Sequence, residues 1–123
     1  MEEIFKAFEK SFGRLEEVLK LEKNAINRDA AIQRFEFTVE LAWKSMQKFL
    51  RSKEIVCRSP KDCLEEAFKF GLISDNELWL EMFKDRNLTV HTYNEETADQ
   101  IYNRLPGYVG LFRELKNNLK DRL

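Results

Sequence analysis

Apolar residues recur every three or four positions along most of this chain, which is the spacing of one face of an α-helix. The first such stretch ends near Asn24, and the second is capped by Asn27 and ends around Ser52. The second stretch is apolar on more than one side, which is typical of a central bundle helix or of a subunit interface. The stripe residues are Phe5, Phe8, Phe12, Leu15 and Leu19 in the first helix and Ile32, Phe35, Val39, Ala42, Met46 and Phe49 in the second, with Phe37, Leu41, Trp43 and Leu50 off the second stripe.

Helix-start and helix-end signals divide the rest of the chain. After a connector at 53–58, Ser59-Pro60 begins a short helix that Gly71 closes. Ser74-Asp75-Asn76-Glu77 reads as a capping box for the next helix. Asn94 then begins the last helix.

The core spacing of the last helix continues across Pro106-Gly107, which favours a kink over a break. Four long helices and one short helix with mostly short connections predict an all-α fold, an antiparallel (up-down) four-helix bundle with an additional short helix. The length fits one domain, residues 1–123.

Composition narrows the classes of function. With 21 basic and 22 acidic side chains the chain is nearly neutral, so any RNA contact needs a local basic patch. No apolar run is long enough to span a membrane, and the acidic N-terminus does not resemble a signal peptide. The spacing of Cys57 and Cys63 fits neither a zinc knuckle nor a redox pair. We therefore expect reduced cysteines, no metal site and no cofactor in a cytoplasmic protein.

Candidate chemistry gathers in residues 79–93. Arg86, Asn87, the only histidine (His91) and Tyr93 lie within eight residues. Arg86 shares its helix face with large apolar side chains, so it needs an anionic or carbonyl partner or lines a cleft that receives one. The weak helix formers after residue 88 predict a joint between two helices at His91, which could turn the imidazole back toward Arg86.

Two carboxylates one turn apart, Glu36 and Glu40, are a second candidate group. They could act as an acid–base pair or hold a metal. We expect instead that one of them neutralises Arg34 or Arg86. Trp43 and Trp79 are most simply core or interface anchors.

Several motifs together resemble the family of nucleotidyltransferase substrate-binding proteins, within the HEPN group of helical bundles. The resemblance covers nearly the whole chain, and its main departure is Pro106-Gly107. The residues that carry it are Ile32 to Lys44, Ser59-Pro60, Glu66-Ala67-Phe68, Gly71-Leu72-Ile73, Trp79, Met82, Arg86-Asn87-Leu88-Thr89, His91-Thr92-Tyr93 and Glu95-Glu96-Thr97-Ala98.

The resemblance implies a homodimer encoded beside a small nucleotidyltransferase. In the toxin–antitoxin versions of the family, the HEPN protein is a metal-independent RNase that uses an R-x-x-x-x-H motif. The nucleotidyltransferase silences it by transferring AMP to the tyrosine of R-x-x-x-x-H-x-Y. By resemblance, Arg86 and His91 are catalytic, Arg86, Asn87 and His91 bind substrate phosphate, and Tyr93 is the AMP acceptor.

Two functions remain open at this point. The chain is either an RNase toxin subunit neutralised by its nucleotidyltransferase partner or a non-catalytic subunit that binds a nucleotide or another substrate for that partner. Both need the same cleft, because Arg86 and His91 would grip phosphate in either case. Metal-free RNA cleavage needs a general base and a general acid, so one histidine per chain calls for a dimer that brings two together.

Overall fold

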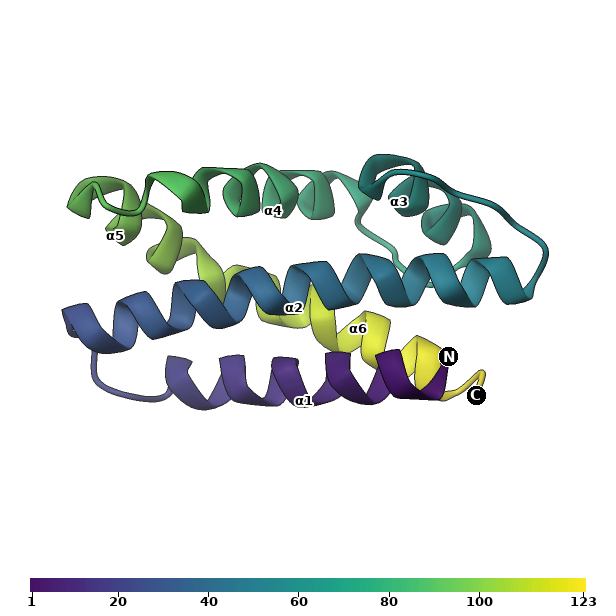
Figure 1. Ribbon diagram of the computed structural model, residues 1–123, viewed down its shortest axis with the longest axis horizontal. Coiled ribbons are helices and arrows are strands. Elements are labelled where there is room, and N and C mark those ends of the chain that lie inside the picture. Colours follow the sequence, from purple (N-terminus) through teal and green to yellow (C-terminus); the bar gives the residue numbers. More distant parts are fainter.

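The computed structural model describes residues 1–123, and it confirms the all-helical fold (Figure 1). The helices are α1 (Glu2–Leu19), α2 (Ala25–Ser52), α3 (Pro60–Phe70), α4 (Asn76–Leu88), α5 (Glu95–Arg104) and α6 (Val109–Lys120), with 3-10 turns η1 (Thr89–His91) and η2 (Leu105–Tyr108). None of the helices is both long and apolar enough to cross a bilayer.

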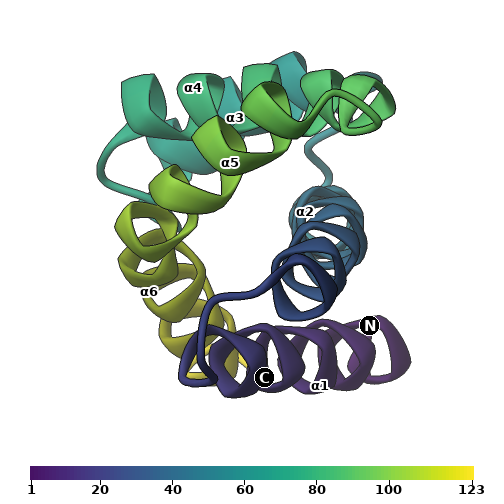
Figure 2. The same ribbon diagram turned by 90° about the vertical axis from the view of Figure 1, so that its left-hand side faces the viewer.

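The long helix α2 runs the length of the molecule and holds the other helices together. In Figure 2, seen end-on, α1, α2 and α6 form three sides of the bundle, and α3, α4 and α5 cover the fourth. The apolar stripes of all these helices meet in one core of 29 buried residues. At its centre, Phe112 contacts the rings of Phe8, Phe12 and Trp79.

Two predicted helix caps are displaced by one to three residues. Asn24, not Asn27, caps α2, and its side chain accepts a hydrogen bond from the Asn27 backbone N–H at 2.8 Å. Asp75, not Ser74, caps α4 by accepting from the Leu78 backbone N–H at 3.0 Å, while the Ser74 hydroxyl donates to Glu114 of α6 at 2.7 Å. A cap predicted from local sequence can fail when a neighbouring residue has the same hydrogen-bonding capacity.

The other predicted boundaries are confirmed. Ser59 caps α3, and Asn94 caps α5. Gly71 closes α3 with φ of 96°, a left-handed conformation that glycine adopts without strain. As predicted, the chain is not broken at Pro106-Gly107: it stays helical and tightens locally into η2, which lies between α5 and α6.

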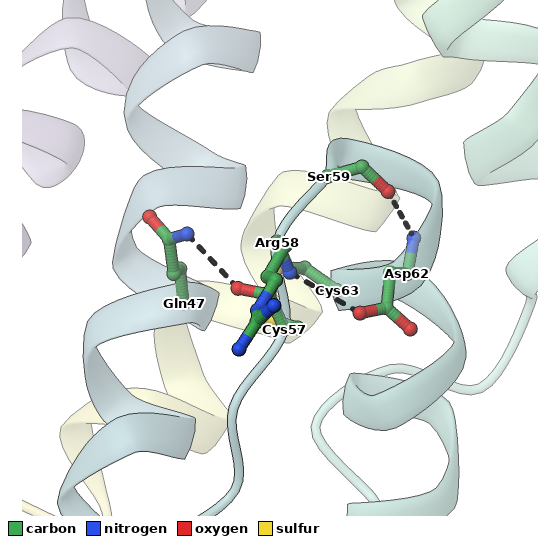
Figure 3. Close-up of a disulfide and its surroundings, with 6 residues drawn as sticks. All are labelled: Gln47, Cys57, Arg58, Ser59, Asp62 and Cys63. Carbon is green, nitrogen blue, oxygen red and sulfur yellow. Dashed lines mark hydrogen bonds between the residues drawn. A yellow bond between two sulfur atoms is a disulfide. The ribbon is translucent and has the colours of Figure 1, made fainter.

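The expectation of two reduced cysteines is wrong: Cys57 and Cys63 form a disulfide, and both are buried. The connector before α3 folds back onto the first turn of that helix, which brings the two Cα atoms to 5.1 Å. Gln47 of α2 holds the same connector by donating to the Cys57 carbonyl at 3.0 Å (Figure 3). The connector is therefore tied to both α2 and α3.

Candidate functional site

Arg86 lies in the last turn of α4 and faces α2. Its guanidinium Nη2 is 3.0 Å from Glu40 Oε1, and the other Glu40 oxygen is 3.7 Å from the Lys44 ammonium. The expectation that one of the paired carboxylates neutralises Arg86 is thus confirmed for Glu40. Arg34 instead donates to the Arg14 carbonyl at 2.8 Å. Glu40 fixes one edge of the guanidinium, while the Nε of Arg86 is buried without a hydrogen-bond partner.

The joint predicted at His91 is confirmed and takes the form of η1. Thr89 is buried and donates from its hydroxyl to the Arg86 carbonyl at 2.6 Å. The Thr92 hydroxyl in turn donates to the Thr89 carbonyl at 2.9 Å. The same two carbonyls also accept the backbone N–H groups of Thr89 and Thr92, so the two hydroxyls reinforce the 3-10 turn at the end of α4.

The joint places His91 and Tyr93 on the surface. Tyr93 is 84% exposed, and its ring lies edge-on to that of His91, with 6.1 Å between the ring centroids. The His91 side chain is also exposed, and its imidazole forms no hydrogen bond or ion pair within the chain. Both side chains are therefore accessible to a reactant or to a second protein.

Two cavities flank this segment and divide the predicted site residues between them. Arg86 and Asn87 line a cavity of about 690 Å³ between α2, α3 and α4. Tyr93 and Thr92 line another, of about 570 Å³, against α2. His91 lines neither. Within one chain, Arg86 and Asn87 therefore share one cavity, and His91 lies beside Tyr93 outside it. The expectation that the joint turns His91 back toward Arg86 is not met.

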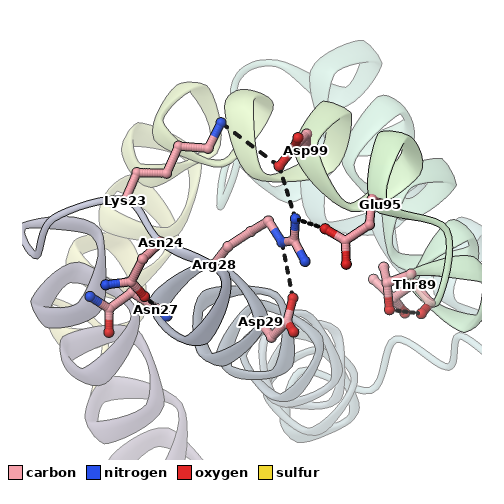
Figure 4. A network of polar contacts seen from close by, with 9 residues as sticks. Lys23, Asn24, Asn27, Arg28, Asp29, Thr89, Glu95 and Asp99 are labelled. Carbon is pink, nitrogen blue, oxygen red and sulfur yellow. Dashed lines mark hydrogen bonds and ion pairs between the residues drawn. The ribbon is translucent and has the colours of Figure 1, made fainter.

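An ionic cluster around the buried Arg28 lies on the C-terminal side of the joint, and we call Arg28, Asp29, Glu95 and Asp99 the Arg28 anchor (Figure 4). The Arg28 guanidinium lies 3.0 Å from Asp29, 2.6 Å from Glu95 and 3.1 Å from Asp99. The hydrogen bond to Glu95 is the main reason why the pKa of Arg28 is raised and that of Glu95 is lowered. The anchor ties α2 to the start of α5.

Sequence reasoning missed Arg28, although a signal was present. An arginine in the first turn of a helix faces the positive end of the helix dipole, which is unfavourable unless carboxylates compensate for it. Glu95 and Asp99 are spaced one turn apart and supply that compensation from α5.

A second cluster, the Asp85 anchor (Asp85, Arg104 and Tyr108), lies on the N-terminal side of the joint, at the end of α4. Asp85 is buried and accepts hydrogen bonds from Arg104 Nε at 2.8 Å and Nη2 at 2.6 Å, and from the Tyr108 hydroxyl. Burial, followed by the bond to Asp85, raises the pKa of Tyr108 above its usual range. The hydrogen bond to Asp85 likewise raises the pKa of Arg104. This anchor fixes α4 against η2 one residue before Arg86.

The chemistry available at the segment is that of its own side chains. They are a guanidinium, an amide, an imidazole and a phenol, and the chain holds no group of three or more His, Cys, Asp or Glu that could bind a metal ion. An imidazole can move a proton near neutral pH, and a guanidinium can grip phosphate oxygens in two places. The arrangement suits phosphate recognition and proton transfer.

The sequence matches the family described as "Nucleotidyltransferase substrate binding protein like" over residues 3–121. It is 38% identical over 97 residues to a Haemophilus influenzae protein named "Probable ribonuclease HepT"; the match covers 75% of this chain and 66% of that relative.

Two solved structures share the fold. A Thermus thermophilus protein is 45% identical, with a TM-score of 0.85 over 91% of this chain and 98% of that one. A Haemophilus influenzae protein is 28% identical, with a TM-score of 0.84 over 94% and 98%. The latter is described as revealing the fold of a substrate binding domain of a nucleotidyltransferase.

Proposed function

The chain belongs to the family of nucleotidyltransferase substrate-binding proteins, and we propose that it is the HEPN-type subunit of a two-component minimal nucleotidyltransferase system. In this proposal it is a metal-independent endoribonuclease toxin that its nucleotidyltransferase partner neutralises. The observation that carries the proposal is the state of the R-x-x-x-x-H-x-Y segment. Arg86 is oriented by Glu40, while His91 and Tyr93 stand exposed on a joint fixed by two anchors.

These residue types suffice for RNA cleavage. A base removes the proton of the ribose 2′-hydroxyl, the 2′-oxygen attacks the phosphorus, and an acid protonates the departing 5′-oxygen. His91 supplies proton transfer, and Arg86 stabilises the charge that develops on the phosphoryl oxygens. Asn87 beside Arg86 adds an amide that can donate to the same phosphate.

A two-fold homodimer would supply the second imidazole. Exposed apolar residues of α2 and of the joint support such a dimer, because Ile26 is 81%, Phe37 55% and Val90 68% exposed. Ile26 and Phe37 lie on the solvent side of α2, and Val90 lies next to His91. Large apolar side chains left exposed on a soluble domain are typical of association surfaces. Light scattering that found only monomer at micromolar concentration would contradict the shared site.

Silencing would act on Tyr93. Its phenol oxygen attacks the α-phosphorus of ATP held by the nucleotidyltransferase, pyrophosphate leaves, and the phenol proton is lost, so that Tyr93 carries AMP. The exposure of Tyr93 beside His91 supports this role. Mass spectrometry after co-expression should show one added adenylate, and Tyr93→Phe should remove it.

The decisive experiment incubates purified protein with total RNA and sequences the new ends. His91→Ala should lower cleavage by roughly two to four orders of magnitude, the usual contribution of general acid–base catalysis, without a change in thermal midpoint. Arg86→Lys should also lower the rate of RNA cleavage, because the point charge of an ammonium does not reproduce the two parallel hydrogen bonds of the planar guanidinium. Chelator should leave the wild-type rate unchanged.

A second candidate is a non-catalytic subunit that presents a nucleotide or another substrate to the nucleotidyltransferase. It is favoured by the separation of Arg86 and Asn87 from His91 within one chain. If wild type cuts no RNA while His91→Ala still loses binding to the nucleotidyltransferase or its substrate, this function replaces the ribonuclease.

A further inference from the structure

The cavity beside Arg86 has features that the ribonuclease chemistry does not use. At about 690 Å³ it falls within the range of small-molecule sites. Trp43 of α2 and Phe83 of α4 line its apolar wall. Lys61 of α3 and Lys84 of α4 line its polar part, together with Arg86. Three helices therefore place aromatic rings and cations around one space.

The charge of the cavity is unbalanced. Glu40 is its one carboxylate, and it is already shared between Arg86 and Lys44. Lys84 is 76% exposed and reaches only Glu81, at 4.0 Å, a contact that contributes little in water. Lys61 forms no ion pair within the chain and is exposed. Two ammonium groups at the cavity are thus available to an anion.

Two buried donors in the lining also lack acceptors. The indole Nε1 of Trp43 and the Nε of Arg86 are buried without a hydrogen-bond partner. A buried donor without an acceptor is costly, and each such group in a native protein needs a physical reason. A ligand rich in oxygen acceptors would provide one.

A disulfide constrains the backbone of the segment that carries Lys61. The Cys57–Cys63 disulfide closes the segment that contains Ser59 and Lys61, and Ser59 caps α3 through the Asp62 backbone N–H at 3.1 Å (Figure 3). The backbone that carries Lys61 is consequently held against α2. Pre-organisation of this kind lowers the entropic cost of binding.

We propose that this cavity binds one nucleotide unit, with its base against Trp43 and Phe83 and its phosphate between Lys61 and Lys84. The proposal rests on the proposed function in one respect: Arg86 lines the same cavity, so in an RNA the bound unit would be the neighbour of the scissile phosphate. A base stacks on an aromatic ring whatever its sequence, and ammonium groups neutralise phosphate. The same chemistry would accept a free mononucleotide.

The test measures binding of a short fluorescent single-stranded RNA by anisotropy, with His91→Ala in every chain so that cleavage cannot interfere. Lys61→Ala with Lys84→Ala should weaken binding about tenfold and lower the slope of log K against log salt by about 0.7 for each lost phosphate contact. Lys6→Ala with Lys20→Ala removes two exposed lysines of the α1 segment and is the charge-matched control. It should change both quantities far less.

The aromatic wall is tested separately. Trp43→Leu should weaken RNA binding about tenfold, and Trp43→Phe, which keeps a ring, should restore most of it. Thermal midpoints of all variants exclude unfolding as the cause. Competition by millimolar AMP distinguishes the two sources: displacement of the RNA identifies a mononucleotide site, and no displacement identifies a subsite for the polymer.

Failure of the two proposals can be told apart. If the lysine pair and the control pair bind RNA equally, or if neither RNA nor AMP binds the parent protein, the nucleotide cavity is overturned. The ribonuclease proposal is tested independently of the cavity, by RNA cleavage with the chain that retains His91. If binding falls as expected but no RNA is cut, the cavity stands and the ribonuclease fails.

Discussion

The two anchors on either side of residues 86–94 use the same charges in opposite ways. In the Asp85 anchor the buried group is the anion, and it serves a buried phenol as well as Arg104. In the Arg28 anchor the buried group is the cation, and its three carboxylates are 46–76% exposed. Carboxylates at the surface can return to water when their partner is lost, whereas a buried phenol cannot.

This difference separates stability from position. The Asp85 anchor joins α4 to η2 beside the core, since the Tyr108 ring also stacks on Phe35 at 5.8 Å. The Arg28 anchor reaches only the first two turns of α5, shortly after the exposed His91 and Tyr93. We infer that the first holds the fold and the second holds the joint. The predictions below test that division.

The largest effect is expected for Asp85→Ala. Removing the buried carboxylate leaves the Tyr108 hydroxyl without its acceptor and Arg104 without its partner. Because Arg104 is 45% exposed, we expect the free energy of unfolding to fall by about 2–3 kcal/mol, below the full cost of breaking a buried pair. Urea denaturation measures it, with the exposed Glu65→Ala as control. A loss equal to that of the control would show that Asp85 does not anchor the fold.

For Arg28→Met we expect a smaller decrease in the free energy of unfolding, about 1–2 kcal/mol. Methionine fills the space of the buried stem, and the carboxylates of Asp29, Glu95 and Asp99 regain hydration. Lys23→Met, which removes the 3.8 Å pair with Asp99 and a cation–π contact with the Tyr102 ring, both at the surface, should cost clearly less than Arg28→Met. If Arg28→Met destabilises as much as Asp85→Ala, the proposed division between the anchors is wrong.

The sequence was sufficient for what depends on neighbours along the chain. Helical periodicity identified the stripes that became the core, and Ser59, Gly71 and Asn94 were correctly placed at helix ends. The cost of leaving a guanidinium unpaired near the core led to the expectation that Glu36 or Glu40 would neutralise Arg34 or Arg86, and the structure shows the pair Glu40–Arg86. The helix stripes and ends follow from rules that act within a few residues, whereas the carboxylate partner of Arg86 followed from the cost of burying an unpaired charge.

What failed depends on segments that are distant in sequence or in conformation. The partners of Arg28 in α5 lie 67 and 71 residues away, and no local pattern identifies them. Ser74, predicted at the start of the capping box, instead donates its backbone N–H and its hydroxyl to Glu114, forty residues away. The Cys57–Cys63 bond required the connector to fold back on α3, and sequence spacing alone does not determine that path. The grouping of Arg86 apart from His91 likewise depends on how η1 turns.

Within the Asp85 anchor, Tyr108→Phe removes one hydroxyl and keeps the ring. We expect a loss of about 1 kcal/mol at neutral pH, the usual net contribution of one hydrogen bond. The raised pKa of Tyr108 adds a pH dependence. A pKa higher in the folded than in the unfolded state stabilises fully below the unfolded value, about 10, and the benefit declines as pH rises above it. Denaturation of both proteins from pH 8 upward should therefore show the difference shrinking; a constant difference would contradict it.

The smallest effect is an acid-side pH dependence at Glu95. Its pKa is lowered, first by the hydrogen bond from Arg28 and then by the charge of that guanidinium. A carboxyl whose folded pKa lies below its unfolded value stabilises the protein above the unfolded pKa, and the benefit is lost as pH falls through the folded one. The stability difference between wild type and Glu95→Gln should hence be constant at neutral pH and shrink as the pH falls below about 5. Glu96→Gln, next to it in the same helical turn and without an ion pair, should show no such change.

Repeating the comparison in Arg28→Met should abolish the pH dependence, because the group that lowers the pKa is gone. If Glu95→Gln retains its acid dependence there, the carboxylate is held by something other than the Arg28 anchor, and α5 is positioned independently of α2.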